Sequence, residues 1–269
     1  KGANISLDSP SVGATFNIMA AAALADGRTT IINAAMEPEV TAAGRFLQKM
    51  GANIEGLGTS TLIIDGVRDL KPCDETTIPD RIEAGTLLIA VAMTKGKATI
   101  RNTNPYHLAF VLERLEETGC EIDIRADEIT IVAPDELLPV NVTTAVYPGF
   151  PTDLQAQWMA LMTAASGAST VTDTIYRDRF MHVPELARLG AAIAINDNTA
   201  TITGGGTLKG ASVMSTDLRA SVAMVMAGLV AEGETHVLRI YHLDRGYECL
   251  ENKLATLGAD IRRVKTEEM

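Results

Sequence analysis

A repeat of about seventy residues constrains this 269-residue chain more than any other feature of its sequence. In each copy, an apolar run of helical length ends at a glycine, and a short β-prone stretch follows. Glycine suits a helix end because it adopts the left-handed conformation without steric cost. The closing glycines are Gly27, Gly96, Gly167 and Gly233, spaced 69, 71 and 66 residues apart. Because the runs are apolar on every side, we expect buried, roughly parallel helices near 13–26, 83–95, 154–166 and 219–232.

A second series of glycines has the same period. Gly51, Gly119, Gly190 and Gly258 are 68, 71 and 68 residues apart. Each ends an amphipathic helical stretch, such as VLERLEETG, and opens an alternating stretch that predicts a β-hairpin. The repeating unit is therefore strand, buried helix, strand, amphipathic helix and hairpin, which predicts an α/β fold.

The repeat also bears on the two ends of the sequence. Lys1-Gly2-Ala3 matches Lys209-Gly210-Ala211, which follows a helix and a hairpin in its own unit, so the first unit here lacks its opening half. The last stretch, TLGADIRRVKTEEM, supplies the first strand of a hairpin and stops before the second. A sheet with a missing strand has an exposed edge. We therefore expect a piece of a longer protein, without its amino-terminal part.

Composition and charge argue against several classes of protein. The formal net charge of -11 disfavours nucleic acid or an anionic membrane as a partner. No apolar run approaches the roughly eighteen residues of a membrane span, and no signal-peptide layout is present. Cys73, Cys120 and Cys249 are far apart and in no C-x-x-C spacing, which fits a reducing compartment and no structural zinc. We expect a cytoplasmic protein whose anionic ligands are held by a few placed arginines.

Polar groups stand at the start of all four apolar helices. Free backbone N–H groups and the positive end of the helix dipole make such starts suited to anions. If the helices are parallel, their starts line one face, which would attract phosphates and carboxylates. The aspartates also fit a simpler interpretation as N-caps, worth about 1 kcal/mol each. The starts comprise Ser11, Val12 and Gly13; Asp80 and Arg81; Thr152 and Asp153; and Asp217 and Arg219.

Capping does not explain the arginines. Arg81 and Arg219 lie where a positive charge opposes the helix dipole. Arg179 in YRDRFMHV and Arg245 in HLDRGYE each follow an aspartate. One interpretation is surface Asp–Arg pairs of little energetic weight. The other is a cluster of guanidinium groups for an anion, which arginine holds bidentately.

The remaining candidates favour structural roles. We expect His182 to pack or cap locally and Trp158 to lie in the core of its helix layer. The glycines of TITGGGTLKG precede no helix, so a hairpin is favoured over a phosphate loop. The three cysteines have no base partner in the sequence and are interpreted as structural.

Several blocks of the sequence resemble the UDP-N-acetylglucosamine enolpyruvyl transferases. The blocks are YPGFPTDLQAQWMALMTAASG, YRDRFMHVPELARLGA, TDLRASVAMVMAGLVAEGET and YHLDRGYECLENKLATLGADI, with SVGAT, AAMEPEV and PDRIEAGT in agreement. The resemblance implies an inside-out α/β barrel of six units in two domains, whose buried parallel helices point their starts at the cleft between the domains. Residues 1–78 would then be the last unit of the first domain. Residues 79–269 would be the second domain, with three units.

The resemblance also implies a reaction and roles for particular residues. The family transfers the enolpyruvyl group of phosphoenolpyruvate to the 3′-hydroxyl of UDP-N-acetylglucosamine in peptidoglycan synthesis, without a metal or an organic cofactor. Asp153 would be the general base, and Arg245 would act with it in catalysis. The resemblance also implies that Arg179, Arg219 and Arg245 grip phosphoenolpyruvate. The diphosphate or uridine would contact Ser11, Val12 and Gly13, and Ile175 would line the nucleotide pocket. Supporting polar groups would be Glu37, Asp80 and Asp217.

The sequence departs from the family pattern in two places. The family's reactive cysteine lies on a glycine-rich loop of the first domain, and its Lys-Asn pair lies near the amino terminus. Neither motif occurs in these 269 residues, and Cys249, after the Arg-Gly-Tyr-Glu run, cannot replace the loop cysteine. The chain is therefore expected to carry part of an active site and to be inactive alone. Two alternatives stay open: the sister enzyme that acts on shikimate 3-phosphate, and a fragment that binds the sugar nucleotide without turnover.

Overall fold

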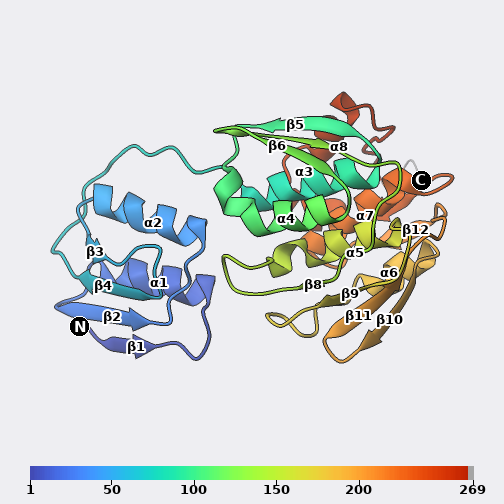
Figure 1. Ribbon diagram of the computed structural model, residues 1–269. Helices are drawn as coiled ribbons and strands as arrows, with labels where there is room; N and C mark the ends of the chain where they lie inside the picture. Colours follow the sequence, from blue (N-terminus) through green and yellow to red (C-terminus); the bar gives the residue numbers. More distant parts are fainter. Residues whose placement is uncertain (266–269) are drawn as a thin grey trace. The chain divides into compact units, whose positions relative to one another are not determined.

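The computed structural model of the chain describes residues 1–265 (Figure 1). It divides into two compact units. The first comprises Lys1–Pro79 with Val146–Gly149, and the second comprises Asp80–Ala145 with the chain from Phe150 onward. No helix within the described residues is both long enough and apolar enough to cross a bilayer.

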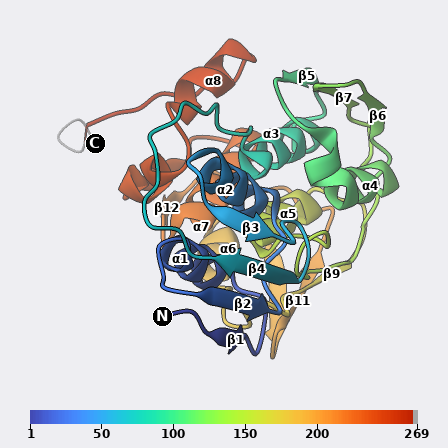
Figure 2. The same cartoon turned by 90° about the vertical axis from the view of Figure 1, so that its left-hand side faces the viewer.

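The first unit is a four-stranded sheet with two helices against it (Figure 2). The strand order is β1-β2-β4-β3, with β1 parallel to β2 and the other pairs antiparallel. Alternate residues of β2 and β4 are buried, among them Ile31, Leu62 and Ile64, so one face of the sheet carries the core. In chain order the elements are β1 (Asn4–Ser6), α1 (Val12–Ala22), β2 (Arg28–Ile32), α2 (Pro38–Lys49), β3 (Asn53–Glu55) and β4 (Thr61–Asp65).

Helix α1 is not buried on every side, so the prediction for residues 13–26 is wrong. Its buried residues are Thr15, Met19 and Ala22 alone. On the other side Phe16 is 47% exposed, and Leu24, just beyond the helix, is 54% exposed. The physical reason is that this unit holds a single all-apolar helix. A sheet and one amphipathic helix cannot cover its whole circumference.

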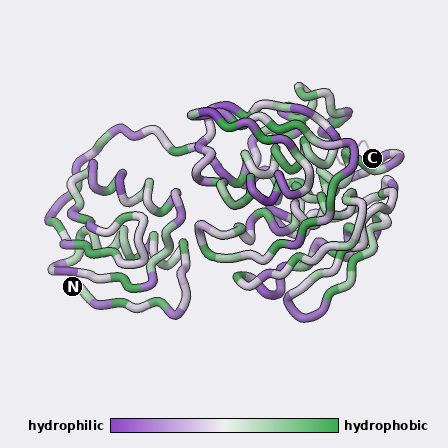
Figure 3. The backbone as a smooth tube through the Cα atoms, in the orientation of Figure 1, coloured by the Kyte–Doolittle hydropathy of each residue, from purple (hydrophilic) through white to green (hydrophobic). Residues whose placement is uncertain are grey.

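Three helices at the centre of the second unit confirm the prediction for the other three apolar runs. They are α3 (Arg81–Met93), α5 (Gln155–Thr163) and α7 (Leu218–Val230), which contact one another pairwise. Every residue of α5 is buried, and most residues of α3 and α7 are buried as well. Figure 3 shows these helices mainly in the colours of hydrophobic and neutral residues.

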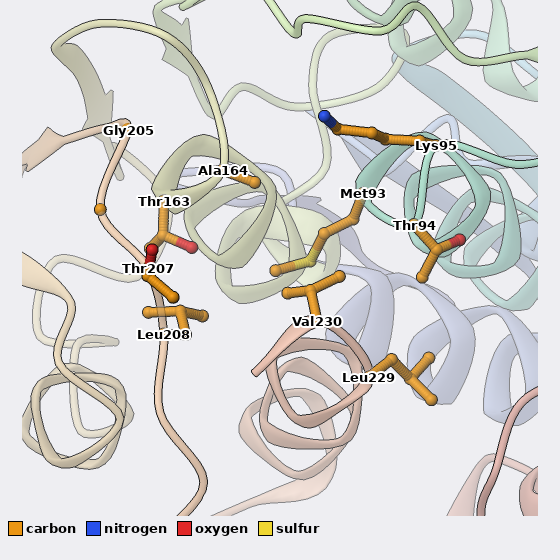
Figure 4. Close-up of a pocket in the computed structure, with 11 residues that line it drawn as sticks. Met93, Thr94, Lys95, Thr163, Ala164, Gly205, Thr207, Leu208, Leu229 and Val230 are labelled. Carbon is orange, nitrogen blue, oxygen red and sulfur yellow. The ribbon is translucent and has the colours of Figure 1, made fainter. Parts of the chain in front are cut away.

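The three central helices run parallel. Their carboxyl-terminal ends line one cavity of about 370 Å³, to which Met93, Thr163 and Val230 contribute (Figure 4). At the other end, hydrogen bonds join the first two turns of these helices and the residues just before α5, as Gln157 donates to Thr86 and Arg219 donates to Asp153. The amino-terminal turns of all three helices thus lie together at one end, and the carboxyl-terminal turns lie together at the other. The positive ends of the three helix dipoles therefore point the same way.

Sheets and amphipathic helices surround this trio. One sheet has the order β5-β7-β6, a second has the order β10-β11-β9-β8, and β12 pairs in parallel with β13. The strands are β5 (Lys97–Arg101), β6 (Glu121–Ile124), β7 (Glu128–Val132), β8 (Val142–Thr143), β9 (Ser169–Thr172), β10 (Ala192–Asn196), β11 (Thr199–Thr203), β12 (Ser212–Met214) and β13 (His236–Leu238). The outer helices are α4 (Ala109–Glu117), α6 (Val183–Arg188) and α8 (Leu250–Thr256), with short 3₁₀ turns η1 (Pro105–Leu108), η2 (Thr152–Leu154) and η3 (Ile240–Arg245).

The repeat is visible in the backbone. All four glycines of the second series, Gly51, Gly119, Gly190 and Gly258, have φ between 95° and 105°. A positive φ also holds for Gly27 and Gly233 of the first series, at 99° and 90°. It does not hold for Gly96 or Gly167, and Lys95 takes the left-handed position beside Gly96 with φ 54°. All four glycines of the second series directly follow the C-cap residue of a helix, whereas Gly27 lies four residues and Gly233 two residues beyond a C-cap. The helix-closing role of glycine is therefore confirmed at four of the eight positions.

The matched tripeptides Lys1-Gly2-Ala3 and Lys209-Gly210-Ala211 have matched structures. A Cβ on Gly2 would lie 2.1 Å from the carbonyl oxygen of Arg28, and a Cβ on Gly210 would lie 2.3 Å from that of Glu234. The absence of a side chain at Gly2 therefore allows the backbone at β2 to approach closely just before β1. The same absence at Gly210 allows the backbone just before β13 to approach closely just before β12. The strand predicted after Gly258 is not formed in residues 259–265, because a strand needs a hydrogen-bonding partner. Residues 266–269 of that stretch lie outside the described residues.

His182 is buried in the second unit and makes stability depend on pH. Its Nε2 lies 3.2 Å from Met159 Sδ, and burial lowers the pKa of the imidazole to about 4. The unfolded chain takes up a proton below about pH 6.5, whereas the folded chain does so only near pH 4. Stability is therefore complete above pH 6.5 and decreases as the pH falls toward 4, by on the order of 3 kcal/mol from this group.

We predict that His182→Leu removes this part of the acid sensitivity. Unfolding in urea at pH 7.5 and pH 4.5 should show a difference in free energy that is smaller in the variant than in the wild type by about 3 kcal/mol. The fluorescence of Trp158, the single tryptophan and fully buried in α5, reports on this unit. An identical pH dependence in both proteins would contradict the prediction.

Candidate active site

Asp153 lies where the starts of the central helices meet, and it binds two arginines. It belongs to η2, the 3₁₀ turn that leads into α5. Its Oδ1 accepts a hydrogen bond from Arg179 Nη1 at 2.8 Å, and its Oδ2 accepts one from Arg219 Nη2 at 3.0 Å. Both arginine side chains are largely buried, with 22% and 12% of their surface exposed.

The N-cap interpretation holds at three helix starts and fails at Asp153. The carboxylate of Asp80 accepts hydrogen bonds from the backbone of Ile82 and Glu83. Asp217 likewise accepts from the first turn of α7, and Ser11 accepts from the first turn of α1. The side chain of Asp153 makes no cap hydrogen bond to α5. Its carboxylate is therefore held by the arginines, in an arrangement that helix formation does not require.

The electrostatics of the site keep Asp153 ionised. Burial acts to raise the pKa of this carboxyl, but the charges and hydrogen bonds of Arg219 and Arg179 outweigh burial, and the pKa lies below its usual range. For Arg219, burial acts to lower the pKa, while the charge of Asp153 and the hydrogen bonds to Asp153 and Tyr247 raise it above the ordinary value. The negative charge of Asp153 thus offsets the unfavourable position of the Arg219 cation at the start of α7.

A buried hydroxyl holds Arg219 from the other side. Arg219 Nη1 donates to Tyr247 Oη at 3.1 Å, and the guanidinium lies 5.7 Å from the centre of the Tyr247 ring. Tyr247 Oη also hydrogen bonds Thr86 Oγ1 at 2.9 Å and lies 3.4 Å from Gln157 Nε2. Burial raises the pKa of the Tyr247 phenol, so this group stays neutral. All three central helices thereby contribute to the placement of Arg219.

Sequence reasoning missed Tyr247 and Asp173, and it named Thr152 only as a polar group at a helix start. Thr152 Oγ1 accepts from Arg179 Nη1 at 3.2 Å, and it donates to Asp173 Oδ2 at 2.6 Å. Asp173 is fully buried and follows β9 directly. A charged residue between β-prone threonines, in TVTDT, was a signal that could have identified Asp173. Tyr247 gave no signal beyond its place beside Arg245, because tyrosine is as common in cores as in sites.

The other predicted site residues of the second unit do not join the Asp153 cluster by hydrogen bonds or ion pairs. Arg245 is exposed at the end of η3 and forms no hydrogen bond or ion pair with any described residue. Ile175 is 43% exposed, on the loop that leads from Asp173 to Arg179. Of the three arginines expected to grip phosphoenolpyruvate, Arg179, Arg219 and Arg245, the structure therefore brings two together. The role of Arg245 remains a prediction.

Four predicted residues belong to the first unit. Ser11 caps α1, and Val12 and Gly13 occupy its exposed first turn. An added Cβ on Gly13 would meet no atom within 4 Å, so this glycine leaves open space beside the helix start. Glu37 precedes α2 without capping it, and its buried Oε2 has no partner among the described residues.

The titratable groups of the site suit proton transfer and anion binding. Within residues 1–265, no group of three or more His, Cys, Asp or Glu side chains could hold a metal ion. Cys73, Cys120 and Cys249 are free thiols. Two guanidinium groups beside an ionised carboxylate provide donors for a phosphate or carboxylate and an acceptor for a proton. They lie at the positive ends of parallel helices, which favours negative ligands.

Comparison with known proteins identifies the class to which this site belongs. A sequence model of the EPSP synthase (3-phosphoshikimate 1-carboxyvinyltransferase) family matches residues 1–254, and the chain belongs to this family. The crystal structure of the enolpyruvyl transferase NikO from Streptomyces tendae superposes with a TM-score of 0.88 at 30% identity, over 97% of this chain and 65% of that one. EPSP synthase from Acinetobacter baumannii, at 18% identity and a TM-score of 0.73, shares the fold over 96% of this chain and 63% of its own. The predicted α/β fold of repeated units around buried parallel helices is therefore confirmed.

The most similar sequences compared carry a more specific name. UDP-N-acetylglucosamine 1-carboxyvinyltransferase of Chlorobaculum parvum is 56% identical over 268 residues, which are 100% of this chain and 63% of the relative. The protein of the same name from Myxococcus xanthus is 52% identical over 98% of this chain and 63% of its own length. The resemblance found in the sequence is confirmed, and the chain spans somewhat less than two thirds of these relatives.

We predict that Arg219 contributes more than Arg179 to the low pKa of Asp153. Arg219→Gln should raise that pKa, because Arg179 alone would then oppose the effect of burial, and Arg179→Gln should raise it by less. Carboxyl carbon NMR of the 269-residue chain labelled with [4-¹³C]aspartate measures this titration directly. Asp65, which pairs with Arg28 in the first unit, serves as the internal control. An unchanged Asp153 titration in both variants would contradict the assignment.

Proposed function

We propose that this chain supplies the general base and the anion-holding arginines of a UDP-N-acetylglucosamine 1-carboxyvinyltransferase. The single observation that carries the proposal is the position of Asp153 between Arg179 and Arg219 at the meeting point of the helix starts. The names of the relatives at 52–56% identity support the same activity. In that reaction the enolpyruvyl group of phosphoenolpyruvate passes to the 3′-hydroxyl of the sugar nucleotide, a step of peptidoglycan synthesis.

The chemistry assigns separate tasks to Asp153 and the arginines. The hydroxyl oxygen of the sugar adds to C2 of phosphoenolpyruvate and C3 gains a proton; phosphate then leaves and C3 loses a proton. Asp153 would accept the proton of the attacking hydroxyl. Arg179 and Arg219, with the exposed Arg245, would hold the phosphate and carboxylate and offset the charge that develops in the transition state. These tasks need no cofactor.

Binding of phosphoenolpyruvate would also change the basicity of Asp153. In the structure both guanidinium groups donate to this carboxylate, which lowers its pKa and makes it a weak base. A phosphate and a carboxylate would compete for the same donors. Asp153 would then keep its burial and lose part of its ion pairing, so its pKa would move up toward the range that suits a general base.

The remaining roles concern the sugar nucleotide and the organisation of the protein. Ser11, Val12 and Gly13 would present the start of α1 to the diphosphate or uridine, and Ile175 would line the nucleotide pocket. Glu37, Asp80 and Asp217 would support the site. Residues 1–78 would be the last unit of one domain and residues 79–269 a second domain of three units. We also propose that the protein acts in the cytoplasm, where its three free thiols would stay reduced.

The activity would require the part of the relatives that this chain does not span. The reactive cysteine loop and the Lys-Asn pair expected from the family do not occur in these 269 residues. Acceptor specificity separates the remaining alternatives. The family name is that of the shikimate 3-phosphate enzyme, whereas the relatives at 52–56% identity are named for the sugar nucleotide. Turnover by the complete protein with shikimate 3-phosphate and not with UDP-N-acetylglucosamine would favour the enzyme that acts on shikimate 3-phosphate.

In the complete protein, Asp153→Asn should lower kcat by roughly a hundred- to ten-thousand-fold, the contribution of a general base. The Michaelis constant for UDP-N-acetylglucosamine should change by no more than a few-fold, because the diphosphate and uridine contacts would lie elsewhere. Phosphate release from phosphoenolpyruvate measures both. Asp65→Asn makes the same change to an arginine-paired carboxylate of the first unit and should leave kcat within two-fold. A wild-type kcat for Asp153→Asn would refute the role of Asp153 as base.

The 269-residue chain alone should release no phosphate above background when supplied with both substrates. Binding of phosphoenolpyruvate by the chain, followed through the Asp153 carboxyl resonance, should still raise the pKa of this group. Near-normal turnover by the isolated chain would show that its site is complete.

A further inference from the structure

Asp173 is an unusual residue that the proposed reaction leaves without a task. Among the Asp, Glu, Lys and Arg residues of positions 1–265, Asp173 is the only one that is buried, with 0% of its surface exposed. Removing a carboxylate from water is costly unless hydrogen bonds and charges replace the solvent. A fully buried carboxylate close to a candidate active site therefore requires an explanation.

Four donors surround this carboxylate, and they fall into two groups. Oδ1 accepts from Thr144 Oγ1 at 2.7 Å and from the backbone N–H groups of Ile175 and Tyr176 at 2.9 and 2.8 Å. Oδ2 accepts from Thr152 Oγ1 at 2.6 Å. The two backbone contacts form an Asx-type turn, in which a side chain replaces a backbone acceptor. Each oxygen of Asp173 therefore holds a different segment.

The Oδ2 side leads to the candidate base. Thr152 precedes Asp153 in η2, and its hydroxyl accepts from the same Arg179 Nη1 that donates to Asp153 Oδ1. Because this hydroxyl donates its proton to Asp173, its lone pairs face Arg179. Loss of that orientation would remove an acceptor from the guanidinium and free the turn that carries Asp153.

The Oδ1 side leads to the loop that precedes Arg179. Thr144, in the stretch after β8, also accepts from Thr174 N at 3.0 Å, so Asp173 and Thr144 together fix the backbone of residues 174–176. Ile175 and Tyr176 project from this turn with 43% and 64% of their surfaces exposed. Two apolar side chains are thus held at the surface by hydrogen bonds to a buried carboxylate, without burial of their own.

We propose that Asp173 is a positioning residue that holds the Asp153–Arg179 pair with one oxygen and the Ile175–Tyr176 turn with the other. The proposal rests on the proposed function, since it treats the first as the reacting side and the second as the wall of the nucleotide pocket. Asp173 itself does not touch either substrate. Its task is to keep the base and the nucleotide wall in one fixed geometry.

Two matched variants separate the two sides of Asp173. Thr152→Val and Thr144→Val each replace one hydroxyl donor by a methyl group of similar size. In the complete protein, Thr152→Val should lower kcat about tenfold or more, with the Michaelis constant for UDP-N-acetylglucosamine within two-fold. Thr144→Val should raise that Michaelis constant about five-fold and leave kcat within two-fold. A purely structural role would lower the melting temperature of both variants without this split.

Asp173→Asn tests the carboxylate itself. The amide oxygen can keep the three donors of the Oδ1 side, which places the NH₂ group against Thr152 and prevents its hydroxyl from donating there. This variant should therefore reproduce the kcat loss of Thr152→Val. If Asp173→Asn does not fold, the threonine pair still decides the question. Unchanged kcat and Michaelis constants in Thr152→Val and Thr144→Val would overturn the proposal.

A measurement on the 269-residue chain distinguishes failure of this proposal from failure of the proposed function. In carboxyl carbon NMR, Thr152→Val should raise the pKa of Asp153, because Arg179 is held less firmly, whereas Thr144→Val should leave it unchanged. Neither variant alters the charge near Asp153, so the comparison is direct. This result with no turnover by the complete wild-type protein would support the positioning of Asp153 and refute the transferase assignment. An unchanged Asp153 pKa in Thr152→Val would overturn the positioning role.

Discussion

The structure depends on the burial of three helices that carry no polar face. Because α3, α5 and α7 are apolar around their circumference, they are stable only when packed against one another and covered by other elements. Polar chemistry is then confined to the helix ends. At the carboxyl-terminal ends a largely apolar cavity remains. At the starts, three positive dipole ends converge, and there the chain places an ionised carboxylate between two arginines.

A second set of polar groups beneath the site supports that arrangement. Tyr247 connects Arg219 with Thr86 and Gln157, and Asp173 connects Thr152 with the loop before Arg179. Tyr247 and Asp173 are both buried, and each forms several hydrogen bonds, which is the condition under which burial of polar groups is tolerated. The guanidinium groups of Arg179 and Arg219 are therefore held by side chains of the protein itself.

The first unit shows what one repeat of this kind does not provide by itself. Its helix α1 has the same apolar composition as the central helices of the second unit, yet Phe16 and Leu24 remain about half exposed. The sheet covers one side of α1 and α2 covers part of another. Complete burial of an apolar helix requires several neighbouring helices, and the second unit has three where the first has one.

The sequence by itself determined the repeat, the apolar helices, the hairpins and the family, because periodicity and glycine placement follow from local geometry. It also singled out Asp153, Arg179 and Arg219 by residue type and position. Only the tertiary structure decided that Asp80 and Asp217 cap helices while Asp153 does not, since a cap and an ion-pair partner look alike in one dimension. It alone revealed Tyr247 and Asp173 as well. Thr86 and Tyr247 are 161 positions apart and meet where the central helices pack, and Thr144 and Asp173, 29 positions apart, meet through the parallel pairing of β8 with β9.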